Sequence, residues 1–167
     1  DFLSPPPPQA LANALETLYA LGALDGAGGL TAPHGERMAL LPLEPQPAAF
    51  LLSTAAEGCQ SDAIGLAALL SVHSPFGSLK PADLAAARAP FAVYEGDAIT
   101  LLNVWKAYTR KTQREGERKA SSWCRKHRLD ERVLRRVGQV REQLAKHVKS
   151  FERADQQRLQ QGSGGGG

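Results

Sequence analysis

The chain has 167 residues, 43% of them hydrophobic and 22% charged, with a formal net charge of +3. Its length suits one ordinary domain or two small ones, and it is short for a complete nucleotide-hydrolysing enzyme. No apolar run approaches the roughly 20 residues of a membrane-spanning helix, which excludes a membrane span. The two cysteines are too few for a disulfide framework or a four-cysteine zinc site.

Residues 1–47 outline a small winged-helix domain. After the proline run, apolar residues recur at steps of three and four along one helical face, namely Leu11, Leu15, Leu18 and Tyr19. Gly22 is well placed to end this helix. A glycine-rich turn over 25–29, a short strand at 30–31 and a short helix over 35–41 follow. The order of helix, short strand and helix within so short a span is typical of a winged helix.

Residues 48–155 predict a second domain that is entirely helical. Its first segment ends at Gly58, and the next one, nearly all apolar over 64–70, is expected to be buried. Pro81 suits the first turn of the helix that follows. Asp97 suits the N-cap of another apolar-periodic helix. The predicted fold class is therefore mainly α, a small winged helix with a short β element followed by a helical bundle.

The last third of the chain combines basic residues with a long apolar stripe. Residues 110–120 are rich in lysine and arginine and predict a solvated loop or a frayed helix end. A long helix follows, in which apolar residues at steps of three and four face a core or an interface: Leu129, Val133, Val137, Val140, Leu144, Val148 and Phe151. Residues 156–167 are rich in glutamine and glycine and predict a flexible tail or linker.

Charge is distributed unevenly along the chain. Residues 1–100 contain ten acidic and three basic side chains, whereas residues 101–167 contain seven acidic and seventeen basic ones. This polarity predicts that the last third faces an anion, of which nucleic acid is the commonest. Four arginines on adjacent turns of the long helix are close enough to contact successive phosphates of one strand: Arg128, Arg132, Arg135 and Arg136. The alternative is a solvated basic helix that binds nothing.

No motif for catalysis or metal binding is found. The sequence lacks the Gly-x-x-x-x-Gly-Lys phosphate loop, and its histidines and cysteines do not have metal-ligand spacing. The chain by itself is therefore expected to have no enzymatic activity, no metal and no cofactor. Trp105, Tyr108 and Trp123 could offer faces for base stacking, but their helical spacing with leucine and valine favours core packing.

The order of several motifs resembles the C-terminal region of DEAH-box ATP-dependent RNA helicases, in which a winged helix precedes a helical ratchet domain. The winged-helix matches are Asp1 to Pro7, Ala10-Leu11, Ala14-Leu15, Leu18 to Asp25, Leu30-Thr31, Gly35, Met38-Ala39 and Leu41 to Pro45. The ratchet-like matches are Gly58-Cys59, Ala67 to Ser71, Phe91, Glu95 to Asp97, Thr100 to Val104, Trp123-Cys124, Leu134 to Arg136 and Val140 to Leu144. Together they cover residues 1 to about 150.

The resemblance implies an accessory module that guides single-stranded RNA during ATP-driven translocation and unwinding or RNP remodelling. Two RecA-like domains, which would hold ATP and Mg²⁺, are expected before this region, and an OB-fold is expected after it. The resemblance further implies an intracellular, nuclear protein without a membrane partner. It also implies that Asp97 and Asn103 lie near the RNA together with the four arginines.

Some residues depart from the family pattern. Ala98 stands where the family usually has histidine, which removes a polar group near the expected RNA path, and Val133 and Val137 replace residues that are usually small or polar. An independent DNA-reading winged helix is disfavoured, because residues 1–50 contain only one basic residue, Arg37, against five acidic ones. A docking platform for a G-patch-type activator, with little RNA contact of its own, fits the acidic first half and stays open.

Overall fold

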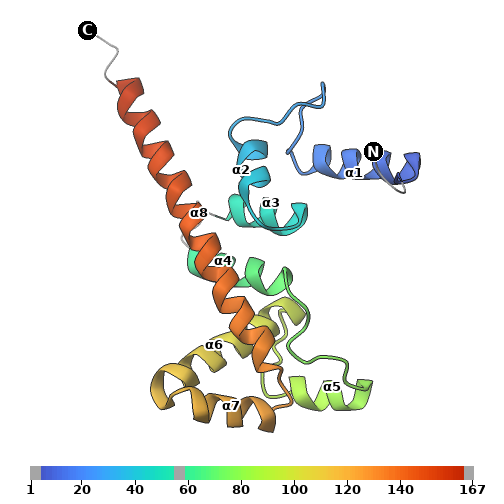
Figure 1. Ribbon diagram of the computed structural model, residues 1–167, viewed down its shortest axis with the longest axis vertical. Coiled ribbons are helices and arrows are strands. Elements are labelled where there is room, and N and C mark those ends of the chain that lie inside the picture. The colour runs from blue at the N-terminus through green and yellow to red at the C-terminus, as the bar shows by residue number, and fades with distance from the viewer. Residues whose placement is uncertain (1–4, 55–58, 164–167) are drawn as a thin grey trace.

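A computed structural model describes residues 5–54 and 59–163 of the chain (Figure 1). The described residues form eight helices: α1 (Pro8–Ala20), α2 (His34–Leu40), α3 (Pro45–Ser53), α4 (Gln60–Leu70), α5 (Pro81–Arg88), α6 (Asp97–Glu115), α7 (Glu117–Lys126) and α8 (Glu131–Ser163). The mainly α fold class is confirmed. In these residues, none of the helices combines the length and the apolar character needed to cross a membrane.

The connection between α1 and α2 contains one β-bridge in place of the predicted strand. Leu24 and Leu30 form an isolated antiparallel bridge, and the part of the chain that the structure describes contains no longer ladder. The physical reason lies in Thr31. Its backbone N–H donates to the carbonyl of Ala23 at 3.0 Å, and its hydroxyl accepts the N–H of Gly35 at 2.9 Å. The chain therefore turns into α2 directly after the bridge.

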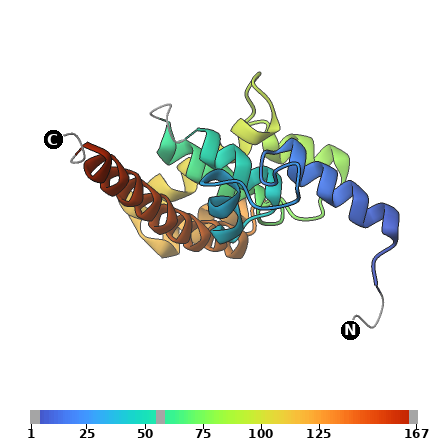
Figure 2. The same ribbon diagram turned by 90° about the horizontal axis from the view of Figure 1, so that it is seen from above.

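The core is organised around α8, which Figures 1 and 2 show as a long rod that crosses the other helices. α4 packs along α8, and α3 and α6 pack against α4. The predicted buried character of 64–70 is confirmed for most of the segment, since Ile64, Ala67, Ala68 and Leu69 are all buried. The predicted apolar stripe of the long helix is also confirmed as core at five positions, Leu129, Val137, Val140, Leu144 and Val148. Val133 and Phe151 are only partly buried, and the neighbouring Leu134, which the stripe did not include, is fully buried.

Residues of α8 belong to two different hydrophobic cores. Val137, Val140, Leu144 and Val148 belong to a core shared with α2, α3, α4 and α6. Leu134 belongs to a second core, in which it meets residues of α5, α6 and α7 together with Phe76. One helix thus joins the segment around α2 and α3 to the α5–α7 end of the molecule.

The segment 110–120 is mostly exposed, as predicted, but the prediction that it is a loop or a frayed helix end is wrong. α6 continues to Glu115, Gly116 turns the chain with φ 81°, and α7 begins at Glu117. Ala120 is fully buried in the second core, and the ion pair between Lys111 and Glu115 supports the last turn of α6. These tertiary contacts outweigh the polar composition of the segment.

Three further boundaries differ in smaller ways. Gly96, with φ 110°, occupies the N-cap of α6 and Asp97 lies in the first turn, whereas Pro81 does begin α5 as predicted. α8 continues to Ser163, so residues 156–163 are helical where a flexible tail is predicted. Glutamine, arginine and leucine favour the helical state, which accounts for this extension. Gly58 lies outside the described residues, and the division into domains at residue 47 stays a prediction.

Candidate nucleic-acid interface

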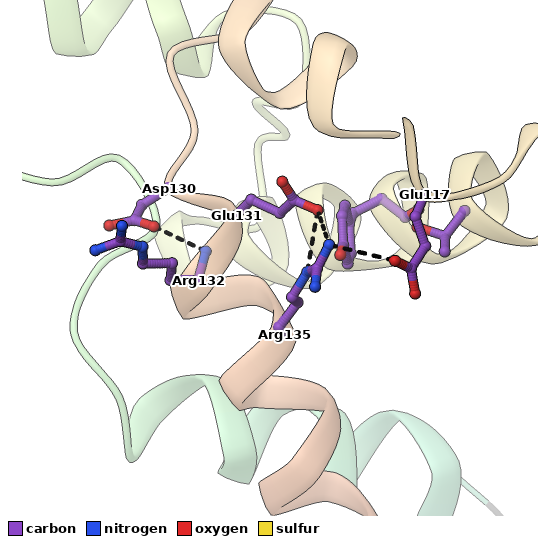
Figure 3. Close-up of polar contacts among 7 residues, drawn as sticks. Glu117, Asp130, Glu131, Arg132 and Arg135 are labelled. Carbon is purple, nitrogen blue, oxygen red and sulfur yellow. Dashed lines mark hydrogen bonds and ion pairs between the residues drawn. The ribbon is translucent and has the colours of Figure 1, made fainter. Parts of the chain in front are cut away.

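Three of the predicted site residues, Arg132, Arg135 and Arg136, are positioned by the start of α8, which is fixed by Asp130. The carboxylate of Asp130 accepts the backbone N–H of Arg132 at 2.8 Å, and the N–H of Asp130 donates to the carbonyl of Pro75 at 2.7 Å. The first contact is a helix N-cap and the second ties the cap to the α4–α5 connection. Figure 3 shows that Arg132 and Arg135 leave this first turn on opposite sides.

Arg135 lies between two carboxylates. Its Nε and Nη2 donate to Glu131 Oε1 at 3.1 and 2.9 Å, and Nη2 lies 3.6 Å from Glu117 Oε2 on α7 (Figure 3). Hydrogen bonds from Ser121 and Arg135 hold the pKa of Glu131 below its ordinary value, so this carboxylate stays charged at neutral pH. The guanidinium of Arg135 thus connects α8 with α7.

Arg128, Asp97 and Asn103 also have partners within the chain. Arg128 precedes α8 and has a left-handed φ of 55°, so the prediction that it shares the long helix with the other three arginines is wrong. It forms an ion pair with Asp83 on α5. Asp97 lies 3.2 Å from the guanidinium of Arg88, and the side-chain amide of Asn103 donates to the carbonyl of Phe91 at 3.4 Å. These contacts fasten α5 and its following loop to α6 and to the start of α8.

Arg132 and Arg136 have a different environment. Together with Val133 they line a hollow of about 570 Å³, whose other wall is formed by the end of α4 and the residues after it, Leu70, Ser71, Val72 and His73. Arg136 donates to Gln139 at 3.3 Å. Within the ranges 5–54 and 59–163, neither arginine lies within ion-pair distance of a carboxylate. We call this feature the α4–α8 hollow.

The α4–α8 hollow is a suitable place for an anion. Its two guanidinium groups are one helical turn apart on the same side of α8, and each can donate two parallel hydrogen bonds to a phosphate. The positive end of the α8 dipole lies in the same turn. Sequence reasoning found both arginines but missed His73 and Gln139, since His73 is far away in sequence and Gln139 carries no charge.

The three aromatic residues with helical spacing lie mainly in the core. Tyr108 is buried and Trp105 is partly buried. The guanidinium of Arg141 lies 5.1 Å from the centre of the Trp105 ring. Trp123 packs against His127 with ring centres 4.8 Å apart. The expectation that packing prevails over base stacking is therefore supported for Tyr108 in particular.

Comparison with known proteins finds one matching family and several similar proteins. Residues 14–43 match the family described as "Helicase associated domain (HA2), winged-helix". The chain is 40% identical over 153 residues to "Probable ATP-dependent RNA helicase DHX35" of Pongo abelii. The aligned residues are 90% of this chain and 20% of the relative. The human protein of the same description is 39% identical over 153 residues, covering 90% of this chain and 21% of the relative.

A second kind of relative has a name that refers to splicing. "Pre-mRNA-splicing factor ATP-dependent RNA helicase prp22" of Schizosaccharomyces pombe is 39% identical over 148 residues, which are 86% of this chain and 12% of that protein. The chain thus spans about a fifth or less of the length of these curated relatives.

Proposed function

The chain is related to the helicase-associated regions of DEAH-box RNA helicases, and from this relationship we propose that it guides single-stranded RNA as an accessory module of a longer helicase. In this proposal, ATP and Mg²⁺ are bound by RecA-like domains of that longer protein, and an OB-fold completes the RNA path. The relatives named as RNA helicases support the choice of ligand, and the relative named as a splicing factor supports a nuclear setting.

The observation that carries the proposal is the pair of arginines in the α4–α8 hollow. Arg132 and Arg136 are exposed and lie on one wall of a hollow large enough for a nucleotide phosphate and its neighbours. Phosphate contacts of this kind position a strand without reading its bases, which suits a surface along which RNA must move. Arg128 and Arg135, which hold α5 and α7, act in this proposal as positioning residues.

The first prediction concerns the salt dependence of RNA binding. For single-stranded nucleic acid, each neutralised phosphate contributes about −0.7 to the slope of log affinity against log salt. The double substitution Arg132→Ala with Arg136→Ala should therefore make the slope less steep by about 1.4. Fluorescence anisotropy with labelled oligouridylate measures this slope directly.

A matched control removes two positive charges elsewhere on the same helix. Lys149 and Arg153 are exposed on the C-terminal half of α8 and do not line the hollow. Lys149→Ala with Arg153→Ala should leave the slope close to that of the parent chain. An equal effect of the two double substitutions would show that net charge, and not the α4–α8 hollow, governs binding and would contradict the proposal.

A second candidate function, docking of a G-patch-type activator, is favoured by the apolar surface of the first helices. On α1, Leu11, Leu15 and Tyr19 are 54%, 48% and 60% exposed. Beside them lies an apolar hollow of about 290 Å³ with Leu18, Leu30 and other residues of the α1–α3 segment in its walls. Exposed apolar patches of this kind typically bind protein partners.

Titration with a G-patch peptide tests this second candidate. Docking predicts saturable binding that is weakened by Leu15→Ala and unaffected by the substitutions at Arg132 and Arg136, because the two surfaces share no residue. Absence of peptide binding to the chain, with RNA binding retained, would leave RNA guidance as the better account.

A further inference from the structure

The hairpin formed by α6 and α7 is strongly basic. Residues 106–128 contain nine lysines and arginines and only two acidic residues, Glu115 and Glu117. The structure folds this segment into two helices that pack on each other, so the charges are held on a rigid element. Such a concentration of one sign of charge raises the local concentration of anions.

Carboxylates neutralise only part of this charge. Lys111 and Lys119 share Glu115, with N···O distances of 2.6 and 3.8 Å, and Lys106 pairs with Asp62 on α4 at 2.6 Å. In the part of the chain that the structure describes, five basic residues of the hairpin have no ion pair: Arg110, Arg114, Arg118, Arg125 and Lys126. The exposed charge of the hairpin is therefore mainly that of arginine.

Arg110 and Arg114 line a hollow of about 250 Å³ with Lys111, Glu115 and Trp123. The two arginines are four residues apart, so they lie one above the other on the same face of α6. Like charges at this spacing destabilise a helix, and an anion bound between them would remove this repulsion. The carboxylate of Glu115, which also lines the hollow, is paired with Lys111 and Lys119 and forms no ion pair with either arginine.

Trp123 adds an aromatic surface to the same hollow. Its ring is held in place by Phe91 and His127, with ring centres 5.8 and 4.8 Å away. A fixed, partly exposed tryptophan beside arginines is the combination with which proteins bind single-stranded nucleic acid, through stacking and phosphate contacts together. An acidic peptide would use the positive charges but not the aromatic face.

We propose that the α6–α7 hairpin is a second binding surface for single-stranded RNA, in which Arg110 and Arg114 bind the phosphate backbone and Trp123 contacts a base. The choice of RNA as the ligand rests on the proposed function. The surface itself is separate, because it shares no lining residue with the α4–α8 hollow. The chain would then hold RNA at two places, one at the start of α8 and one on the hairpin.

The test measures the affinity of the whole chain for labelled oligouridylate against salt. Arg110→Ala with Arg114→Ala should make the slope less steep by about 1.4 and weaken binding about 25-fold at 0.1 M salt. Arg110→Lys with Arg114→Lys keeps the charge but loses the planar guanidinium group, so its affinity for RNA should lie between those of the alanine variant and the parent chain. Both arginines are exposed and repel each other, so neither substitution should lower the temperature of thermal unfolding.

The outcomes separate this inference from the proposed function. If Arg110→Ala with Arg114→Ala matches the Lys149→Ala, Arg153→Ala control while Arg132→Ala with Arg136→Ala weakens binding, the inference is wrong and the proposed function stands. If neither arginine pair affects RNA binding, both are wrong. If the hairpin variant loses binding of polyglutamate but retains RNA, the hairpin is a surface for an acidic protein, which also overturns the inference.

Discussion

Gly35 shows how closely the first helices are fitted together. A methyl group at this position would lie 2.0 Å from the carbonyl oxygen of Ala23 and 2.9 Å from the hydroxyl of Thr31. Both contacts are far shorter than van der Waals distances, and one of them is with backbone. Only glycine allows α2 to approach the preceding loop in this way.

Gly35→Ala is therefore expected to destabilise the chain by about 3 kcal/mol, the upper end of the usual cost of overpacking. The control is Gly138→Ala in α8, where a Cβ would meet nothing within 4 Å. That substitution should stabilise by about 0.5–1 kcal/mol, since alanine favours the helix. Urea unfolding followed by circular dichroism measures both, and equal effects would contradict the packing described for α2.

The two cysteines should differ sharply in reactivity. Cys124 is buried in the second core, and burial raises the pKa of its thiol to about 11. Cys59 is exposed. Because the thiolate is the reactive form, an aromatic disulfide reagent should modify Cys59 rapidly and Cys124 only after unfolding. Rapid modification of both thiols in the native chain would show that the second core opens readily.

The individual roles of the arginines could be predicted only in part from the sequence. The spacing of Glu131 and Arg135 is i, i+4, so this pair could be expected on a helix. Glu117 and Asp83, the partners contributed by α7 and α5, are distant in sequence, and only the fold brings them to Arg135 and Arg128. Only the structure therefore distinguishes Arg128 and Arg135, which connect helices, from the two arginines that line the α4–α8 hollow.

At the scale of elements, α8 packs along α4 and shares a hydrophobic core with it. Leu144 is fully buried in the core shared by these helices, whereas Leu159, further along α8, is 75% exposed. Leu144→Ala should cost about 2–5 kcal/mol because it leaves a cavity. Leu159→Ala, the same chemical change at an exposed site, should cost less than about 0.5 kcal/mol. Chemical denaturation distinguishes the two variants.

The contacts of Glu131 with Arg135 and with Ser121 on α7 make the stability of the fold depend on pH. The folded chain holds the pKa of Glu131 below the ordinary value of 4.5. A lowered pKa contributes stability that is present above the unfolded value and is lost as the pH falls through the folded value. Glu131→Gln should therefore reduce the loss of stability on acidification below about pH 4.5, relative to the parent chain.

The matched control for this experiment is Glu142→Gln, an exposed glutamate on the same helix. Unfolding free energies at a series of pH values, measured with urea, give the comparison. If Glu131→Gln and Glu142→Gln change the pH profile equally, the network of Glu131, Arg135 and Ser121 does not support the fold as described.

Prediction of elements from the sequence succeeded where apolar periodicity is strong. Most of the α8 stripe follows from leucines and valines at steps of three and four, and the burial of α4 follows from its nearly continuous run of apolar residues. The failure at 110–120 has the opposite cause. Ala120 is the only apolar residue there, and its burial depends on the second core, which no local pattern reveals. A lone alanine carries too little signal to indicate a helix.

At the scale of the whole molecule, α8 connects the first three helices with the rest of the chain. Arg37 of α2 pairs with Asp155 of α8 and lies 5.3 Å from the centre of the Phe151 ring. Gln60 of α4 donates to Glu152 at 2.7 Å in the same region. These contacts hold α2 and the start of α4 against the C-terminal half of α8.

The central claim is that RNA contacts Arg132 and Arg136 in the α4–α8 hollow. The most direct measurement is an NMR titration of the ¹⁵N-labelled chain with oligouridylate, in which the Nε–H signal of each arginine is followed separately. The account predicts that the signals of Arg132 and Arg136 shift on binding, while that of Arg135, held by Glu131 and Glu117, does not. RNA binding that leaves the Arg132 and Arg136 signals unchanged would contradict it.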